Sequence, residues 1–331
     1  MKRLSRLQAW LQNGCELAHC SITPVSGDAS FRRYFRVLNN GRSYIAMDAP
    51  PENEDCRPFI EVTRQLADAG LHVPHIHEMD LAAGFLLLDD LGDELYLKHL
   101  NESNAHSLYA DALQALLKIQ STDPSKLPAY DRTLLLAEME LFRDWFLSKH
   151  LDITLSPRDH DLLTQTFTTL AGHALAQPQV FVHRDYHSRN LMLTSDNNPG
   201  LLDYQDAVRG PVTYDLLSLL RDSYIAWPPQ WVSRWALGYR DAIVAAEIMG
   251  AVDDETFLRW FDLMGIQRQL KVCGIFARLY HRDGKPAYLR NIPLTFRYLS
   301  EICRRHPQTA PLSRLLQSLD IEQRLEAQTI P

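Results

Sequence analysis

The chain has 331 residues, of which 46% are hydrophobic, 23% charged and 9% aromatic, and its formal net charge is −7. This composition is typical of a soluble globular protein, and the length allows one large or two ordinary domains. The acidic balance argues against a nucleic-acid partner, because proteins that bind nucleic acids usually carry a basic surface. It is compatible with cationic ligands, although net charge alone does not identify a ligand.

Cysteine usage and apolar segments bear on the compartment. The five cysteines are scattered without a C-x-x-C pair, which is typical of reduced thiols rather than of a disulfide framework or a zinc site. The segment 4–10 is too short and too polar for the core of a signal peptide. No apolar run approaches the 18 residues that a membrane span needs. We therefore expect a cytoplasmic protein with no membrane association and no obligate protein partner.

The first third of the chain predicts a small β-rich region. Residues 1–18 carry leucines at helical spacing, and residues 31–37 and 44–47 flank an Asn-Asn-Gly turn, which predicts a helix and then a hairpin. Residues 26–30 precede the first strand, in the position of a phosphate-covering loop. They hold only one glycine, and an ordinary hairpin turn explains them about as well.

A further helix and two strands complete this region. Residues 56–69 form an amphipathic segment closed by Gly70, which predicts a helix beside the sheet. Residues 73–79 and 85–88 read as strands, and a polar, glycine-containing break follows them. The break predicts a hinge and a domain boundary at about 91–95.

Helices dominate the remaining chain. A serine followed by a proline at 156–157 marks one helix start, because serine caps a helix and proline suits its first position. The other predicted helices lie at 103–121, 131–149, 213–224, 230–249, 254–280 and 287–305. The predicted fold class is therefore α+β, with a small β-rich N-terminal lobe and a larger, mainly helical C-terminal lobe.

The most informative stretch is F-V-H-R-D-Y-H-S-R-N-L-M at 181–192, followed by L-L-D at 201–203. Phosphoryl transfer needs a group that orients or deprotonates the attacking hydroxyl, and oxygen ligands for magnesium. Asp185, Asn190 and Asp203 match the Asp, Asn and Asp of the kinase pattern at its spacing. A surface hairpin with a polar tip explains the turn at 195–200, but not a polar cluster between two apolar runs.

This pattern assigns roles to the stretch. Asp185 is the predicted catalytic group, ionised at neutral pH because an exposed Asp has a pKa near ~3.9. Asn190 belongs to the same catalytic set and, with Asp203, is predicted to hold Mg²⁺. His183 is expected to brace the loop, and Asp215 to accept hydrogen bonds from it. The predicted cofactors are ATP and Mg²⁺.

The nucleotide contacts depart from the kinase pattern. A lysine belongs on the third strand, but Met47 stands there and no lysine lies between Lys2 and Lys98. Either an arginine replaces the lysine, since a guanidinium forks onto phosphate oxygens, or nucleotide binding is impaired and the chain is a pseudokinase. The predicted nucleotide-binding residues are Ser30, Arg32 and Arg33 near the loop, and Asp89 and Leu91 at the hinge, where backbone groups would meet an adenine edge.

Candidate acceptor contacts follow the motif. An acceptor with hydroxyl groups needs several hydrogen-bonding side chains, and the predicted substrate contacts are His187, Asp206, Arg221, Asp222 and Tyr224. A structural role explains His187 equally well, and a turn-stabilising role explains Asp206 slightly better.

These residues carry a resemblance to a known family. Through 181–192 and L-L-D-Y-Q-D-A-V-R-G-P-V-T-Y-D-L-L-S-L-L-R-D at 201–222, the chain resembles the aminoglycoside phosphotransferase family, the small-molecule branch of the kinase-like fold. Through M-D-A-P-P-E-N-E-D at 47–55 and G-I-F-A-R-L-Y-H-R-D-G-K-P-A-Y-L at 274–289, it resembles more closely the bacterial cell-wall-recycling kinases of N-acetylmuramate and N-acetylglucosamine.

The resemblance implies a two-lobed protein-kinase-like fold with a nucleotide-binding lobe at 1–92 and a helical lobe at 93–331 that carries the catalytic loop and acceptor site. It implies a sugar kinase that phosphorylates the anomeric hydroxyl during peptidoglycan recycling. Two alternatives remain. The kinase could act on an aminoglycoside or choline-like acceptor, or the chain could be a catalytically dead nucleotide-binding module.

Overall fold

The structure, a computed structural model, describes residues 2–25 and 31–327 and divides into two compact units. The sheet unit comprises residues 1–99 and 190–206, and the helical unit comprises residues 100–189 and 207–331. The segment 190–206 thus belongs to the sheet unit, although it lies far along the chain. The predicted functional lobes at 1–92 and 93–331 stay a prediction.

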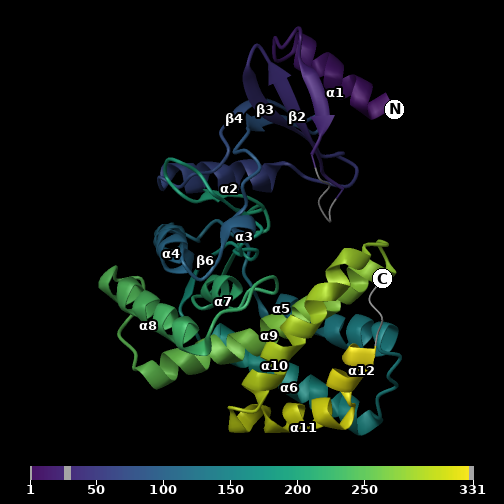
Figure 1. The fold of residues 1–331 in the computed structure, drawn as a ribbon, viewed down its shortest axis with the longest axis vertical. Helices are drawn as coiled ribbons and strands as arrows, with labels where there is room; N and C mark the ends of the chain where they lie inside the picture. Colours follow the sequence, from purple (N-terminus) through teal and green to yellow (C-terminus); the bar gives the residue numbers. More distant parts are fainter. Residues whose placement is uncertain (1, 26–30, 328–331) are drawn as a thin grey trace. The chain divides into compact units, whose positions relative to one another are not determined.

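The sheet unit is built on a five-stranded antiparallel sheet with strand order β1-β2-β3-β5-β4 (Figure 1). Its strands are β1 (Ser21–Pro24), β2 (Arg33–Asn39), β3 (Arg42–Asp48), β4 (Ile76–Asp80) and β5 (Phe85–Asp89). Its other elements are α1 (Lys2–Asn13), α2 (Arg57–Asp68), α3 (Tyr96–His99), β7 (Leu191–Met192) and β8 (Gly200–Leu201). The predicted first helix, hairpin, second helix and strands are confirmed, and the first helix ends earlier than predicted.

Helix α1 covers one face of this sheet. Its Leu7 and Leu11 lie one turn apart, are fully buried, and pack with Val37, Ala46 and Leu87 of three strands. Each such leucine contributes roughly 1.5–3 kcal/mol when buried. The N-terminal helix is therefore an integral part of the hydrophobic core of the sheet unit.

The β7–β8 hairpin is attached to the sheet unit through its backbone. Leu201 N donates to His72 O at 2.8 Å, and Leu193 N donates to Glu94 O at 2.6 Å. A Cβ atom at Gly200 would lie 2.9 Å from Leu91 Cδ1, so the close approach of the hinge to the hairpin favours glycine. These contacts explain why residues 190–206 fold with the N-terminal part of the chain.

The helical unit contains two short strands and a set of helices. Ser156 caps α6 with a reciprocal side-chain bond to Asp159, as the sequence predicts. The elements are α4 (Ala105–Ser121), α5 (Arg132–Leu141), η1 (Phe142–His150), α6 (Pro157–Leu175), β6 (Gln179–Val182), β9 (Val208–Pro211), α7 (Tyr214–Leu220), α8 (Pro229–Ala245), α9 (Asp254–His281), η2 (Pro286–Asn291), α10 (Ile292–Cys303), η3 (Pro307–Thr309), α11 (Ala310–Ser318) and α12 (Ile321–Ala327).

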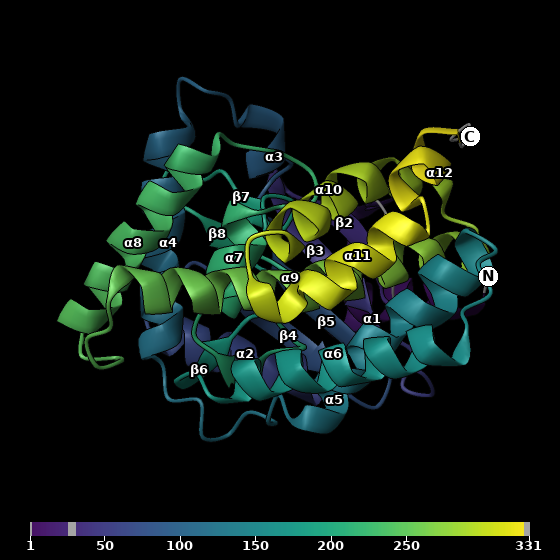
Figure 2. The ribbon, with the colours of Figure 1, turned by 90° about the horizontal axis from the view of Figure 1, so that it is seen from below.

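Helix α9 is the centre of the helical unit. It spans 28 residues, is buried around almost its whole circumference along its middle, and packs against α5, η1, α6 and α10. Figures 1 and 2 both draw α10 alongside it. Gly274 faces the backbone of α5 so closely that a Cβ atom there would lie 2.3 Å from the carbonyl carbon of Leu141. The helix crossing therefore depends on the absence of a side chain at this position.

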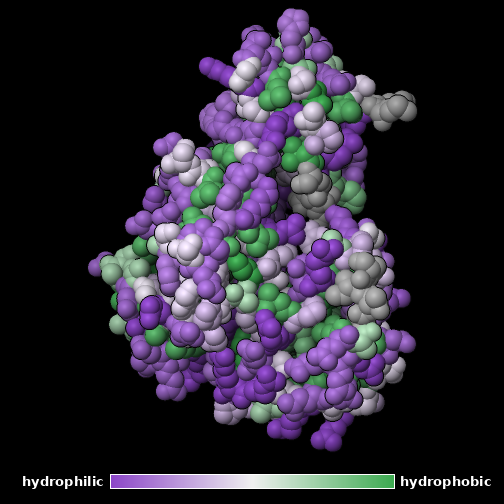
Figure 3. All heavy atoms as spheres, in the orientation of Figure 1, coloured by the Kyte–Doolittle hydropathy of each residue, from purple (hydrophilic) through white to green (hydrophobic). Residues whose placement is uncertain are grey.

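Hydrophilic side chains cover most of the molecular face drawn in Figure 3, and hydrophobic residues appear there in small groups. The large hydrophobic side chains that are exposed among the described residues all lie in the sheet unit: Phe31, Leu38, Met79 and Leu81. Over residues 2–25 and 31–327, the structure contains no helix with the length and apolar character to span a membrane.

Gly274→Ala is expected to destabilise the protein by about 2–3 kcal/mol, because the added methyl group overpacks the contact between α9 and Leu141. The measurement is the free energy of unfolding by denaturant. Gly238→Ala is the matched control, because Gly238 lies in helix α8 with open space around it. The control gains helix propensity and is expected to be more stable by about 0.5–1 kcal/mol. Equal effects of the two substitutions would contradict the packing argument.

Candidate active site

The predicted catalytic loop begins where β6 ends, in the helical unit. His183 N and Arg184 N donate to the two carboxylate oxygens of Asp215 at 2.6 and 3.0 Å. Asp215 lies in the first turn of α7 and is fully buried. Burial raises the pKa of this carboxyl to about 7, although the two backbone bonds act to lower it. The expected contact between Asp215 and the loop is therefore present.

Asp185 lies in this loop with its backbone braced by a histidine. Asp185 N donates to Nδ1 of the fully buried His183 at 3.3 Å, which fits the bracing role predicted for His183. Burial acts to raise the pKa of Asp185, but cationic and polar neighbours outweigh it and lower that pKa below its ordinary value. The neighbours that lower it are Lys271, His187, Arg184 and Arg268. Asp185 is thus ionised at neutral pH.

A buried carboxylate behind the loop binds two of these cations. Glu138 of α5 accepts from Arg184 Nη2 at 2.5 Å and lies 2.9 Å from Lys271 Nζ. It also accepts a hydrogen bond from Tyr130, and Lys271 donates to Tyr214 at 2.9 Å. Burial acts to raise the pKa of Glu138, but Lys271 and Arg184 outweigh it and lower that pKa. One carboxylate therefore holds two charged side chains next to Asp185.

Two predicted substrate residues have structural partners in the helical unit. Asp222 is fully buried and accepts from Ser188 N at 3.0 Å and from Ser188 Oγ at 2.5 Å. Its other oxygen accepts from Tyr224 N at 3.0 Å. Arg221 forms a buried ion pair with Asp262 at 2.5 Å. These contacts hold the end of the catalytic loop and the core, and contact of either residue with substrate stays a prediction.

The remaining predicted acceptor residues of the helical unit form an aromatic group beside the loop. His187 and Tyr224 meet edge to face with ring centroids 5.4 Å apart. The guanidinium of Arg189 lies 4.8 Å from the centroid of Tyr224 and 5.6 Å from that of Tyr288. Burial lowers the pKa of His187, so its ring is neutral at pH 7, and its Nδ1 is buried without a hydrogen-bond partner.

The sheet unit holds the predicted metal ligands. Asn190 and Asp203 meet across the base of the β7–β8 hairpin, where Asn190 Nδ2 donates to Asp203 Oδ2 at 3.4 Å. Asp203 has a φ of 64°, a left-handed conformation that Asp tolerates better than most residues. Gln205 Nε2 donates to Asp203 Oδ1 at 2.8 Å and to Asp206 Oδ2 at 3.2 Å. The predicted substrate residue Asp206 thus lies beside the predicted metal residues.

The donor chemistry of this group fits Mg²⁺. Mg²⁺ prefers carboxylate and amide oxygens and keeps water and substrate phosphates as its other ligands. The Oε1 atom of Gln205 is a buried oxygen without a hydrogen-bond partner, in a side chain that bridges the carboxylates of Asp203 and Asp206. In the described part of the chain no group of three or more His, Cys, Asp or Glu side chains could hold a metal. The arrangement matches a site of one or two carboxylates rather than an all-protein cage.

The structure distinguishes the two arginines proposed in place of the missing lysine. Met47 is fully buried in β3, and the neighbouring Asp48 forms an ion pair with Arg33. Arg32 Nε pairs with Glu54 at 3.2 Å. Burial acts to lower the pKa of Arg32, but the neighbouring acidic side chains Tyr34, Glu54, Asp203 and Asp206 raise it overall. Arg32 is therefore within electrostatic range of the metal-ligand group. Ser30 and the loop 26–30 lie outside the described residues.

The predicted hinge residues also have defined contacts. The carboxylate of Asp89 lies 2.7 Å from His77 Nε2 and accepts from His75 N at 3.1 Å. Leu91 packs against Gly200 of the hairpin. Since the Asp89 side chain is engaged within the sheet unit, a nucleotide contact at the hinge would come from backbone groups, as the sequence analysis expects.

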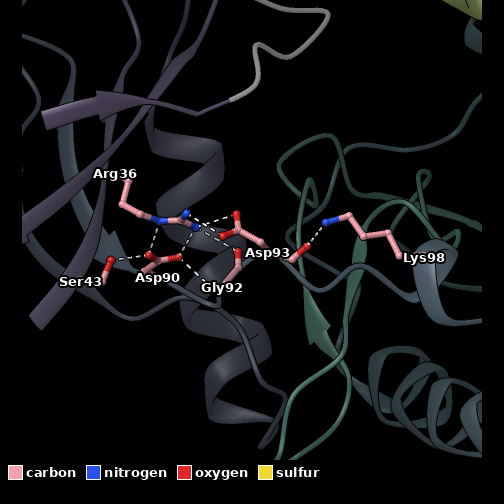
Figure 4. A network of polar contacts seen from close by, with 6 residues as sticks. All are labelled: Arg36, Ser43, Asp90, Gly92, Asp93 and Lys98. Carbon is pink, nitrogen blue, oxygen red and sulfur yellow. Dashed lines mark hydrogen bonds and ion pairs between the residues drawn. The ribbon is translucent and has the colours of Figure 1, made fainter.

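A polar network fixes the chain that follows the hinge (Figure 4). Arg36 of β2 lies 2.6 Å from Asp90 and 2.7 Å from Asp93, and Ser43 donates to Asp90 at 2.5 Å. Lys98 Nζ donates to the carbonyl of Asp93 at 2.6 Å. The ion pairs with Arg36 lower the pKa of Asp93. The network ties the sheet to residues 90–98 of the same unit.

The overall architecture matches solved kinase-like structures. An ethanolamine kinase from Plasmodium vivax matches 96% of this chain and 89% of its own with a TM-score of 0.65 and 10% sequence identity. An ADP-bound aminoglycoside phosphotransferase matches 90% of this chain and 98% of its own with a TM-score of 0.59 and 14% identity. At these identities the likeness shows the fold, and the predicted kinase-like α+β fold is confirmed.

Sequence comparison gives the family. Residues 21–251 match the model of the phosphotransferase enzyme family, and the chain belongs to that family. N-acetylmuramate/N-acetylglucosamine kinases from Pseudomonas putida and Neisseria meningitidis are 46% and 41% identical to it. These matches cover 96% and 98% of this chain and the same shares of the two relatives. The predicted phosphotransferase class and family are therefore confirmed.

Three charged residues beside the catalytic loop were not predicted from the sequence: Glu138, Arg268 and Lys271. Each lies in a segment whose pattern is that of an ordinary helix. Glu138 and Lys271 are more than a hundred positions apart in the sequence. For Arg268 and Lys271 the one sequence signal is the run Q-R-Q-L-K at 267–271, where polar residues interrupt an otherwise apolar helix. Helical periodicity does not tell whether such residues face solvent or a buried partner.

Glu138→Gln is expected to destabilise the protein by about 3–5 kcal/mol, because it leaves the buried Lys271 and the half-buried Arg184 without their carboxylate. Denaturant unfolding measures the effect. Glu140→Gln in the same helix is the matched control, since its ion pair with Arg143 is partly exposed and such pairs contribute at most about 1 kcal/mol. A loss at Glu138 no larger than that of the control would show that the cluster does not hold the loop.

Proposed function

We propose that this protein is a kinase that uses Mg²⁺ and ATP to phosphorylate the anomeric hydroxyl of N-acetylmuramate and N-acetylglucosamine. The single observation that carries the proposal is Asp185, which is ionised and fixed by His183 and Asp215 in a loop that continues directly into Asn190. The names of the full-length relatives support the acceptor, and the ADP-bound structural neighbour supports a nucleotide donor. Peptidoglycan recycling is the pathway we infer for such a kinase.

In this proposal Asp185 orients the acceptor hydroxyl and accepts its proton. A positioned general base contributes roughly 10²–10⁴ in rate, which corresponds to about 3–5 kcal/mol of barrier. A carboxylate whose pKa is lowered is a weak base, so its larger contribution is the fixed direction in which it points the hydroxyl. His183 and Asp215 are positioning residues in this scheme, because they act on the loop and not on the acceptor.

In this proposal, residues of the sheet unit bind the metal and the phosphate groups. Asn190 and Asp203 would hold Mg²⁺, which neutralises phosphate charge when bound. Arg32 takes the role of the absent strand lysine. Its guanidinium interacts electrostatically with Asp203 and is already oriented by its ion pair with Glu54. This assignment favours a working enzyme over the pseudokinase alternative.

The helical unit favours a neutral or anionic acceptor over a cationic one. Buried polar atoms without hydrogen-bond partners include Ser223 Oγ and Tyr298 OH, which suit the hydroxyl groups of a sugar. They also include nitrogen atoms of Arg268 and Arg278. An aminoglycoside or choline-like acceptor would bring further positive charge to these arginines. That repulsion disfavours both alternatives.

Phosphate transfer to a panel of acceptors tests the proposal. With Mg·ATP, we expect transfer to N-acetylmuramate and N-acetylglucosamine but not to glucose, choline or kanamycin. Asp185→Asn is expected to lower kcat by about 10²–10⁴, whereas Asp161→Asn on exposed α6 should have no effect. Transfer to kanamycin or choline instead would keep the phosphotransferase mechanism and exclude the sugar assignment. An Asp185→Asn enzyme of normal rate would exclude the assigned catalytic residue.

A nucleotide-binding measurement tests the replacement of the lysine. Arg32→Met is expected to weaken Mg·ATP binding about tenfold or more, because it removes a charge-assisted contact to phosphate. Arg33→Met is the matched control, since Arg33 pairs with Asp48 instead. Calorimetric titration of both variants with ATP and GTP gives the dissociation constants. Weaker binding in Arg33→Met than in Arg32→Met would reverse the assignment of the two arginines.

A further inference from the structure

Arg268 is a buried cation without a bonding partner. It lies on α9 with 4% of its surface exposed. Its Nε and Nη1 atoms are buried and have no hydrogen-bond partner, and the structure of residues 2–25 and 31–327 shows no ion pair for it. Lys271 and Arg221, which are also buried, have ion pairs with Glu138 and Asp262, although Nη1 of Arg221 likewise lacks a hydrogen-bond partner.

A buried arginine without a partner lowers the stability of the folded state. Burying a guanidinium removes its hydration, and a cation that stays inside a protein is normally paired with an anion or hydrogen-bonded throughout. Two unsatisfied N–H directions in one side chain therefore indicate an acceptor that binds from outside the chain. The fork of an arginine suits a group with two adjacent oxygen atoms, such as a carboxylate.

The position of Arg268 ties this acceptor to the reacting centre. Its charge acts on Asp185, His187 and Asp215, all of which belong to or hold the catalytic loop in the helical unit. Arg184 and Lys271 share the carboxylate of Glu138, whereas Arg268 has no ion pair among the described residues. A ligand with a negative charge would supply the missing partner.

We propose that Arg268 binds the carboxylate that N-acetylmuramate carries and N-acetylglucosamine lacks. The inference rests on the proposed function, since it names the residue that distinguishes the two acceptors. In N-acetylmuramate the carboxylate belongs to a lactyl group that is joined through an ether oxygen to the third carbon of the sugar ring. The anomeric hydroxyl is on the first carbon, within the same stretch of ring atoms from C1 to C3. An acceptor that presents that hydroxyl to Asp185 brings its carboxylate into the neighbourhood of Arg268.

A transferred phosphoryl group is the rival anion for the same side chain. The two anions predict different effects of an Arg268 substitution on the two sugars. The phosphoryl group is transferred to every acceptor, whereas only N-acetylmuramate carries the carboxylate. A comparison between acceptors therefore separates them. It also cancels any general effect of Arg268 on Asp185, which both sugars experience equally.

The experiment measures kcat/KM for N-acetylmuramate, its neutral carboxamide and N-acetylglucosamine. In the unsubstituted enzyme, we expect the carboxamide to be about 10- to 100-fold poorer than the acid, as a charge-assisted contact requires. In Arg268→Gln the acid should lose that advantage, so that acid and carboxamide differ by less than about threefold. Arg268→Lys keeps the charge without the fork and should recover part of the preference. Arg259→Gln, on the exposed part of the same helix, should behave as the unsubstituted enzyme.

The outcomes separate the inference from the function on which it rests. An enzyme that phosphorylates neither sugar overturns the proposed function and the role of Arg268 together. An enzyme that phosphorylates both sugars but accepts acid and carboxamide equally overturns only the role of Arg268, and it does so without any variant. Equal loss for both sugars in a folded Arg268→Gln protein overturns the carboxylate contact and supports the phosphoryl group.

Discussion

Three buried carboxylates hold the catalytic loop, and the geometry of Asp185 depends on them. Asp215 accepts the backbone N–H groups at the start of the loop, and Asp222 accepts from Ser188 near its end. Glu138 binds the side chain of Arg184 between them. Asp215 lies at the start of α7 and Asp222 just beyond its end, and Glu138 lies in α5, so the loop is fixed only when these two helices pack against it. This constraint also explains the left-handed φ of 75° at Arg184, where backbone and side chain are pulled toward different partners.

One continuous sequence stretch serves both compact units. The loop through Arg189 belongs to the helical unit, and the chain from Asn190 to Asp206 belongs to the sheet unit. Backbone hydrogen bonds from Leu193 to Glu94 and from Leu201 to His72 attach the latter part to the N-terminal portion of the sheet unit. The predicted acceptor-activating residue and the predicted metal ligands are therefore neighbours in sequence, yet each is held by the core of a different unit.

The strand position that carries a lysine in the kinase pattern is apolar in this chain. In the sheet unit Met47 occupies a fully buried place in β3, where a lysine would need a partner. Arg32, which precedes β2, pairs with Glu54, which precedes α2. Asp203 and Asp206 act on the charge of Arg32 within the same unit. We propose Arg32 as the cation that takes the place of the strand lysine.

The sequence alone determined the order of the elements, the kinase-like fold and the principal candidate residues Asp185, Asn190 and Asp203. These follow from local signals, since periodicity, turn residues and motif spacing act over a few positions. The tertiary structure decided which charges are paired and which are not. In the folded chain Arg33 pairs with Asp48, Arg32 with Glu54 and Lys271 with Glu138. Two nitrogen atoms of Arg268 have no hydrogen-bond partner. Such pairings join residues far apart in the chain, and their strength depends on burial, which only the packed fold establishes.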